Sequence, residues 1–233
     1  MIVAIDGPAG AGKSTIARRV AARLGAVYID TGAMYRAVAL LALRSDTDLA
    51  DAGRLESLAR TADIQFEAGT ARTLLNGEDV SEAIRKPEVS PAASKVSAIP
   101  GVRRALVEKQ RQMGAAASVV MEGRDIGTVV FPNAEVKIFL DADPGVRAAR
   151  RLRELQEKGQ APPAAEVARE IRERDHRDST RAESPLVPAP DAVRLDSTAL
   201  SLDQVEQAIL KVIESHQSSA VSHQARRQPL ADG

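Results

Sequence analysis

A glycine-rich loop near the N-terminus is the first feature that could carry chemistry. Residues Gly7, Pro8, Ala9, Gly10, Ala11, Gly12, Lys13 and Ser14 match the pattern G-x-x-x-x-G-K-[ST] at every position. In such a loop backbone N–H groups surround phosphate oxygens, and the helix that follows adds the positive end of its dipole. We expect Lys13 to reach the β- and γ-phosphates and Ser14 to ligate Mg²⁺. Because a plain glycine turn rarely meets the whole pattern, the loop, with Thr15, predicts nucleoside triphosphate binding.

Triphosphate binding alone does not distinguish a kinase from a GTPase switch or a motor. Switch GTPases need N-K-x-D to read guanine and D-x-x-G to sense the γ-phosphate, and neither string occurs in this chain. ATPase motors usually need more than its 233 residues. The remaining class is the small kinases, in which an insert and a lid close over the acceptor.

Clustered arginines are consistent with a small kinase. Two predicted helices carry Arg147, Arg150 and Arg151 on one face, and Arg174, Asp178 and Arg181 on another. Arginine binds phosphate in a bidentate way, and transfer between two anionic phosphates requires positive charge on both sides. The alternative is a solvated salt-bridge face. An ionised acceptor phosphate attacks directly, so no general base is expected.

Alternating strands and helices are predicted to position these residues. Buried, β-branched runs at 2–5, 27–30, 118–121, 136–140 and 193–195 indicate about five parallel strands. With helices between them, they predict a three-layer α/β P-loop kinase fold. We assign residues 1–62 and 86–217 to its core, with a helical lid at about 148–166. The turn signal Asn76-Gly77 predicts a small antiparallel insert at 63–85, and 218–233 is predicted to be a disordered tail.

Glu122 follows the apolar strand 118–121, where phosphate-loop enzymes often hold Mg²⁺ or its waters with a carboxylate. It is therefore a candidate metal ligand together with Ser14, directly or through water. The alternative is an acid at the edge of the sheet with no further role.

Composition excludes several classes of function. Lys plus Arg and Asp plus Glu both number 32, so net charge gives no reason to expect nucleic-acid or membrane partners. The chain has no cysteine, which removes disulfides and thiolate chemistry. No apolar run approaches the roughly 20 residues of a membrane helix. We expect a soluble, cytoplasmic monomer.

Several separated motifs, in order, resemble the bacterial cytidylate kinases. They are Asp-Thr-Gly-Ala-Met-Tyr-Arg (30–36), Asn-Gly-Glu-Asp-Val (76–80), Glu-Gly-Arg-Asp-Ile-Gly-Thr-Val-Val-Phe-Pro (122–132), Arg-Asp-His-Arg-Asp-Ser-Thr-Arg (174–181) and Leu-Asp-Ser-Thr (195–198). The likeness runs from the first strand to about Ile213. It implies transfer of phosphate from ATP to CMP or dCMP with Mg²⁺, and it assigns the insert to a monophosphate-binding domain.

The resemblance also implies roles for single residues. Lys13, Arg124, Arg174 and Arg181 would be catalytic, and Arg150 would join the phosphate loop on the ATP side. Residues that would contact the phosphate, sugar or base of the acceptor are Thr31, Tyr35, Arg36, Ser94, Arg103, Arg124, Asp125, Arg174, Asp178 and Arg181. Asp178 would lie near the ribose, and Ser94, Arg103 and Asp125 would read the base.

The assignment to cytosine is chemically consistent. Cytosine presents an amino donor at N4 and an acceptor at N3, which Asp125 and Arg103 would complement, whereas uracil would place O4 against the carboxylate. By its sequence alone, Asp125 could equally be a partner of Arg124 or a turn residue. Two other functions compete: a kinase acting on UMP, shikimate or dephospho-coenzyme A, and a regulator that binds ATP without turnover.

Overall fold

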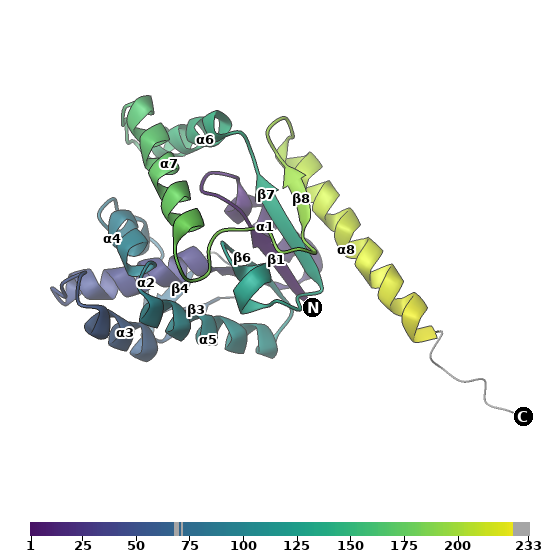
Figure 1. The fold of residues 1–233 in the computed structure, drawn as a ribbon, viewed down its shortest axis with the longest axis horizontal. Coiled ribbons are helices and arrows are strands. Elements are labelled where there is room, and N and C mark those ends of the chain that lie inside the picture. Colours follow the sequence, from purple (N-terminus) through teal and green to yellow (C-terminus); the bar gives the residue numbers. More distant parts are fainter. Residues whose placement is uncertain (68–69, 71, 226–233) are drawn as a thin grey trace, which may run out of the picture.

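The central sheet has five parallel strands. The structure is a computed structural model that describes residues 1–67, 70 and 72–225 (Figure 1). The strands follow the order β2-β6-β1-β7-β8. Their bounds are β1 (Ile2–Asp6), β2 (Val27–Asp30), β6 (Val119–Gly123), β7 (Val136–Asp141) and β8 (Val193–Asp196). Each neighbouring pair is parallel, so all C-terminal ends meet at one edge. The predicted sheet is confirmed.

Helices cover both faces of this sheet. Alternation along β1 directs Val3 and Ile5 toward α1 (Lys13–Leu24) and α8 (Leu202–Ala225), whereas Ala4 joins a cluster on the opposite face. That second cluster includes residues of α5 (Pro100–Ala116) and of a short π-helix, η2 (Ile126–Val130), which the sequence did not predict. The three-layer α/β architecture is confirmed.

A helical subdomain extends from one side of the sheet. It contains α2 (Thr31–Arg44), α3 (Ala52–Thr61), a 3₁₀ turn η1 (Ala83–Arg85) and α4 (Val89–Val96), packed with α5 around one apolar core. The insert forms a small antiparallel sheet in the order β3-β4-β5, with bounds Ile64–Phe66, Thr73–Leu75 and Glu78–Asp79. Ile64 and Leu75 join the core of the helices. The small sheet therefore packs against the apolar core of this subdomain.

Two packed helices, α6 (Pro144–Glu157) and α7 (Ala164–Thr180), lie beyond the strand ends (Figure 1). The predicted lid, at about 148–166, spans most of α6, the connection between the helices and the first residues of α7. Asp143 caps α6 by accepting the amides of Gly145 and Val146 at 2.8 and 3.2 Å. Helix α7 ends at Thr180, so Arg181 lies just past the helix in extended backbone rather than on it as predicted. Its side chain still turns toward the pocket described below.

The last helix is longer than the sequence analysis predicted. Helix α8 runs to Ala225, so the prediction of a disordered tail is wrong for 218–225, and 226–233 lie outside the described residues. Positions 218–225 contain neither glycine nor proline, and a helix already nucleated at 202–213 continues at little cost without a stop signal. None of the helices in the described part of the chain is both long and apolar enough to cross a membrane.

Candidate active site

The phosphate loop joins β1 to α1 at the C-terminal edge of the sheet. Gly7, Gly10 and Gly12 have φ values of +151°, +76° and +91°, a range that side chains disfavour. At Gly10 space is also lacking, since a Cβ would lie 2.9 Å from the carbonyl oxygen of Arg147 on α6. The glycines thus allow the loop to curl, and at Gly10 they allow α6 to pack directly on it.

Lys13 lies buried at the start of α1, with 6% of its surface exposed. Its Nζ donates to the carbonyl of Pro8 at 2.7 Å, within the same loop. Burial, followed by repulsion from Arg124 and Arg174, lowers the pKa of Lys13 to about 7, and Glu122 and Asp6 act in the opposite direction. Lys13 therefore lies within electrostatic reach of the arginines that line the neighbouring pocket.

Glu122 is buried near the end of β6 and accepts the hydroxyl of Tyr28 at 2.5 Å. Burial and the neighbouring Asp30 raise the pKa of Glu122, and Lys13 and the Ser14 hydroxyl oppose this rise. Among the residues that the structure describes, no three acidic or histidine side chains form a metal cluster. Mg²⁺ does not need one, because it takes one or two oxygen ligands from the protein and the rest from phosphates and water. The oxygen donors of Ser14 and Glu122 fit that requirement.

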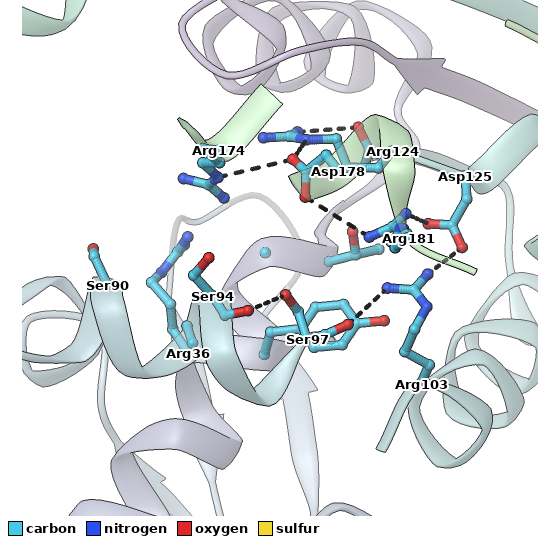
Figure 2. Close-up of a pocket in the computed structure, with 15 residues that line it drawn as sticks. Arg36, Ser90, Ser94, Ser97, Arg103, Arg124, Asp125, Arg174, Asp178 and Arg181 are labelled. Carbon is cyan, nitrogen blue, oxygen red and sulfur yellow. Dashed lines mark hydrogen bonds and ion pairs between the residues drawn. The ribbon is translucent and has the colours of Figure 1, made fainter. Parts of the chain in front are cut away.

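A cavity next to the loop collects the predicted acceptor residues (Figure 2). It has a volume of about 620 Å³, part of it open to solvent. It is lined by Thr31, Gly32, Tyr35, Arg36, Ser90, Ala93, Ser94, Ser97, Arg103, Gly123, Arg124, Asp125, Arg174, Asp178 and Arg181. All ten residues predicted to contact the acceptor are in this set. The lining includes no described residue of 63–85, so α4, not the small sheet, supplies that wall.

One end of the cavity is built around Asp125. A buried hydrogen bond joins Asp125 Oδ2 to Arg103 Nη2, and Arg181 Nη2 lies 3.6 Å from Oδ1. Arg103 also donates to the Ser97 carbonyl at 3.3 Å and lies 5.6 Å from the centre of the Tyr35 ring. Burial opposes the charge on Arg103, but Tyr35 and Asp125 outweigh it and raise the pKa of Arg103. Asp125 is therefore the partner of Arg103, and not of Arg124.

The other end gathers three arginines around Asp178. Arg124 Nε donates to Asp178 Oδ2 at 2.8 Å, and Arg174 and Arg181 approach the same carboxylate at 4.0 and 3.9 Å. Burial disfavours the carboxylate, yet these three cations lower the pKa of Asp178. Arg36, on α2, also lines the cavity, and its Nη2 donates to the Asp30 carboxylate at 2.8 Å.

The cavity is strongly cationic in a chain of zero net charge. Five arginines face two carboxylates in its lining, which leaves three positive charges in excess. Among the described residues, four buried side-chain nitrogen or oxygen atoms have no hydrogen-bond partner. Three of them belong to this lining: Arg36 Nε, Arg103 Nε and Arg181 Nη2. Unpaired buried donors are costly, so their concentration here indicates a site built for an anionic ligand with several acceptors.

The three arginines predicted to share a face of α6 lie in different environments. Arg150 lies against the loop, donating to Ser197 Oγ at 3.0 Å and approaching the Ala11 carbonyl at 3.5 Å. Arg147 is buried and donates to the Ala9 carbonyl at 3.0 Å and to Asp175 at 2.5 Å, so its predicted place on a phosphate-binding face is wrong. Arg151 pairs with Glu154 on the surface. Only Arg150 therefore stays a candidate contact for ATP.

Sequence reasoning missed four residues that contact these groups. Ser90 and Ser97 line the cavity with Ser94. Ser97 is the C-cap residue of α4, and the spacing of four and three residues would have placed the three serines on one helix face. The Tyr28 hydroxyl donates a hydrogen bond to Glu122. The Asp6 carboxylate accepts the backbone amides of Ile126 and Gly127, which follow Asp125. No local pattern in the sequence signals these last two contacts.

The phosphate loop after the central strand, together with the arginine-rich pocket beside it, defines a phosphate-loop kinase. The chain matches the cytidylate kinase family over residues 3–215 and belongs to that family. It is 63% identical to the cytidylate kinase of Solibacter usitatus (strain Ellin6076), over 92% of this chain and 93% of the relative. It is 50% identical to that of Lactiplantibacillus plantarum (strain ATCC BAA-793 / NCIMB 8826 / WCFS1), over 94% and 97%. A crystal structure of an uncharacterized protein from Eubacterium ventriosum ATCC 27560 shares the fold, with a TM-score of 0.50 at 12% identity over 92% and 99%.

Proposed function

We propose that this chain transfers the γ-phosphoryl group of ATP to CMP or dCMP, giving ADP and CDP or dCDP. The observation that carries the proposal is the convergence of ten predicted acceptor residues on one cationic cavity beside the phosphate loop. Membership in the cytidylate kinase family supports the same reaction.

In this proposal the acceptor is its own nucleophile. An oxygen of its ionised phosphate attacks the γ-phosphorus in line, the bond from that phosphorus to the β–γ bridging oxygen breaks, and the electron pair leaves with ADP. The loop amides and Lys13 hold the donor phosphates, and Arg124, Arg174 and Arg181 stabilise negative charge that spreads over the transferred group. Arg36 and Thr31 orient the acceptor phosphate.

The deeper end of the cavity would read the base. Asp125 Oδ1 or Oδ2 accepts from the cytosine N4 amino group, and Arg103, held over Tyr35, donates to N3 or O2. Uracil would direct its O4 at the carboxylate, and an unpaired buried polar group costs about 1–3 kcal/mol, which is tenfold to a hundredfold in kcat/KM.

Ser14 and Glu122 would hold Mg²⁺, with Tyr28 fixing the orientation of the Glu122 carboxylate. When bound, the ion would offset part of the negative charge on the ATP phosphates. The proposed reaction uses no residue from a second copy of the chain, and we propose that the protein acts as a monomer.

A coupled assay of ADP release tests the proposal. ATP and Mg²⁺ are supplied with CMP, dCMP, UMP, AMP, GMP, dTMP or shikimate in turn, and we expect strong turnover with CMP and dCMP. Asp125→Asn should lower kcat/KM for CMP and reduce the ratio of kcat/KM for CMP to kcat/KM for UMP. Turnover with a different acceptor alone would retain the kinase and overturn the cytosine pocket. ATP binding without turnover on any acceptor would favour a regulator.

A further inference from the structure

The carboxylate of Asp6 lies buried at the last position of β1, immediately before the phosphate loop. Its Oδ1 accepts the backbone amide of Ile126 at 2.8 Å, and its Oδ2 accepts the amide of Gly127 at 2.7 Å. Only 5% of the residue is exposed. Asp6, on the strand that leads into the phosphate loop, therefore binds the segment that follows Asp125, although 120 positions separate Asp6 from Ile126 in the chain.

These two amides are the first two of the π-helix η2, whose N-cap residue is Asp125. The first N–H groups of a helix have no partner within it, and an aspartate at the N-cap normally turns its side chain back to accept them. Asp125 does not do so: η2 has no side-chain cap from its own N-cap residue. The Asp125 carboxylate instead points into the cavity toward Arg103 and Arg181 (Figure 2).

We propose that Asp6 is a positioning residue for base recognition: it caps η2 from the neighbouring strand and so leaves the Asp125 carboxylate free to face the acceptor base. The inference rests on the proposed function, because it concerns the residue that we assign to reading cytosine. It also links the start of the phosphate loop to the base-reading segment, since Asp6 precedes Gly7 directly in the chain.

Loss of the Asp6 carboxylate has a definite consequence. In Asp6→Asn the side-chain oxygen can accept only one of the amides of Ile126 and Gly127, and the other amide would face the side-chain NH2 group and be left unpaired in a buried site. As the N-cap residue, Asp125 is placed to turn its carboxylate toward the free amide. The repulsion that Asp125 exerts on Asp6 would be absent as well, which removes a barrier to that rotation. Asp125 would then turn away from Arg103 and no longer distinguish cytosine from uracil.

The test is the ratio of kcat/KM for CMP to kcat/KM for UMP at saturating ATP. The ratio is independent of the fraction of active protein, so a merely structural role of Asp6 would not change it. We compare wild type, Asp6→Asn and Asp125→Asn. Ile138→Val serves as the control, because Ile138 is a buried residue of the adjacent strand β7 outside the acceptor cavity. We expect Asp6→Asn to lower the ratio about tenfold, toward that of Asp125→Asn, and Ile138→Val to leave it unchanged.

A second variant applies if Asp6→Asn fails to fold. Asp6→Ala removes both acceptors without setting a side-chain NH2 group against the two amide N–H groups, so it should lower the ratio in the same direction. If wild type prefers CMP and Asp125→Asn loses that preference, an unchanged ratio in Asp6→Asn, or in Asp6→Ala where Asp6→Asn does not fold, overturns this inference alone. If wild type shows no preference for CMP, the base-reading role is overturned together with the inference.

Discussion

Replacement of Lys13 by methionine should abolish activity and yet stabilise the nucleotide-free protein. Lys13 is almost fully buried, and burial with nearby arginines lowers its pKa from 10.5 to about 7. One pKa unit corresponds to about 1.4 kcal/mol, so the folded state disfavours a charged Lys13 by several kcal/mol at pH 7. Methionine fills a similar volume without that charge, and it loses only the bond to the Pro8 carbonyl.

The sign of the pH dependence follows from proton binding. Between pH 7 and pH 10.5 the unfolded lysine is protonated and the folded one is largely neutral, so the unfolded state binds more protons. The penalty that Lys13 places on stability is therefore fully present below about pH 7, and it decreases as pH rises across this window, by about 1.4 kcal/mol per unit. Methionine does not titrate, so the difference in the free energy of unfolding between Lys13→Met and wild type should be largest at pH 7 and nearly vanish by pH 10.

Urea unfolding followed by far-UV circular dichroism, in EDTA and without nucleotide, measures both quantities. Lys137→Met is the matched control, because Lys137 is also a buried lysine but pairs with Asp191 at 2.8 Å, so its loss should destabilise. In the coupled assay Lys13→Met should lose at least ~10²-fold in kcat. A Lys13→Met protein no more stable than wild type at pH 7, or a stability difference that is the same at pH 7 and pH 10, would refute this reasoning.

Two further substitutions test contacts at the edges of the site. Asp175 on α7 accepts the Ala9 amide at 3.3 Å, so Asp175→Asn should weaken ATP binding about tenfold. Glu173→Gln, on the exposed surface of the same helix, should not, and an unchanged KM for ATP in Asp175→Asn would contradict the role of this contact. Glu206, 4% exposed, accepts from Arg23 at 3.1 Å and anchors α8 to α1. Glu206→Gln should lower the free energy of unfolding by about 1–3 kcal/mol, and a changed KM for either substrate would show that the anchor affects the site.

Local patterns in the sequence were sufficient for the sheet and the phosphate loop. A buried parallel strand needs only a short apolar run, and the loop needs glycines at fixed offsets because its backbone geometry is local. The hairpin turn at Asn76 and Gly77 was predictable for the same reason, and both residues have positive φ in the structure. The ten acceptor residues were a different matter: they were found through separated motifs that resemble a family, and not through their periodicity.

Only the tertiary structure decided which charges meet. Arg147, Arg150 and Arg151 are nearly adjacent in sequence, yet one is buried against Ala9, one lies at the loop and one is on the surface. Asp125 precedes η2 in the chain, but the cap of that helix comes from Asp6, on a different strand. Hydrogen bonds act over about 3 Å, and segments distant in sequence come that close only when the sheet order places β1 beside β6. Sequence supplied the kinds of side chain, and the packing of strands and helices determined their partners.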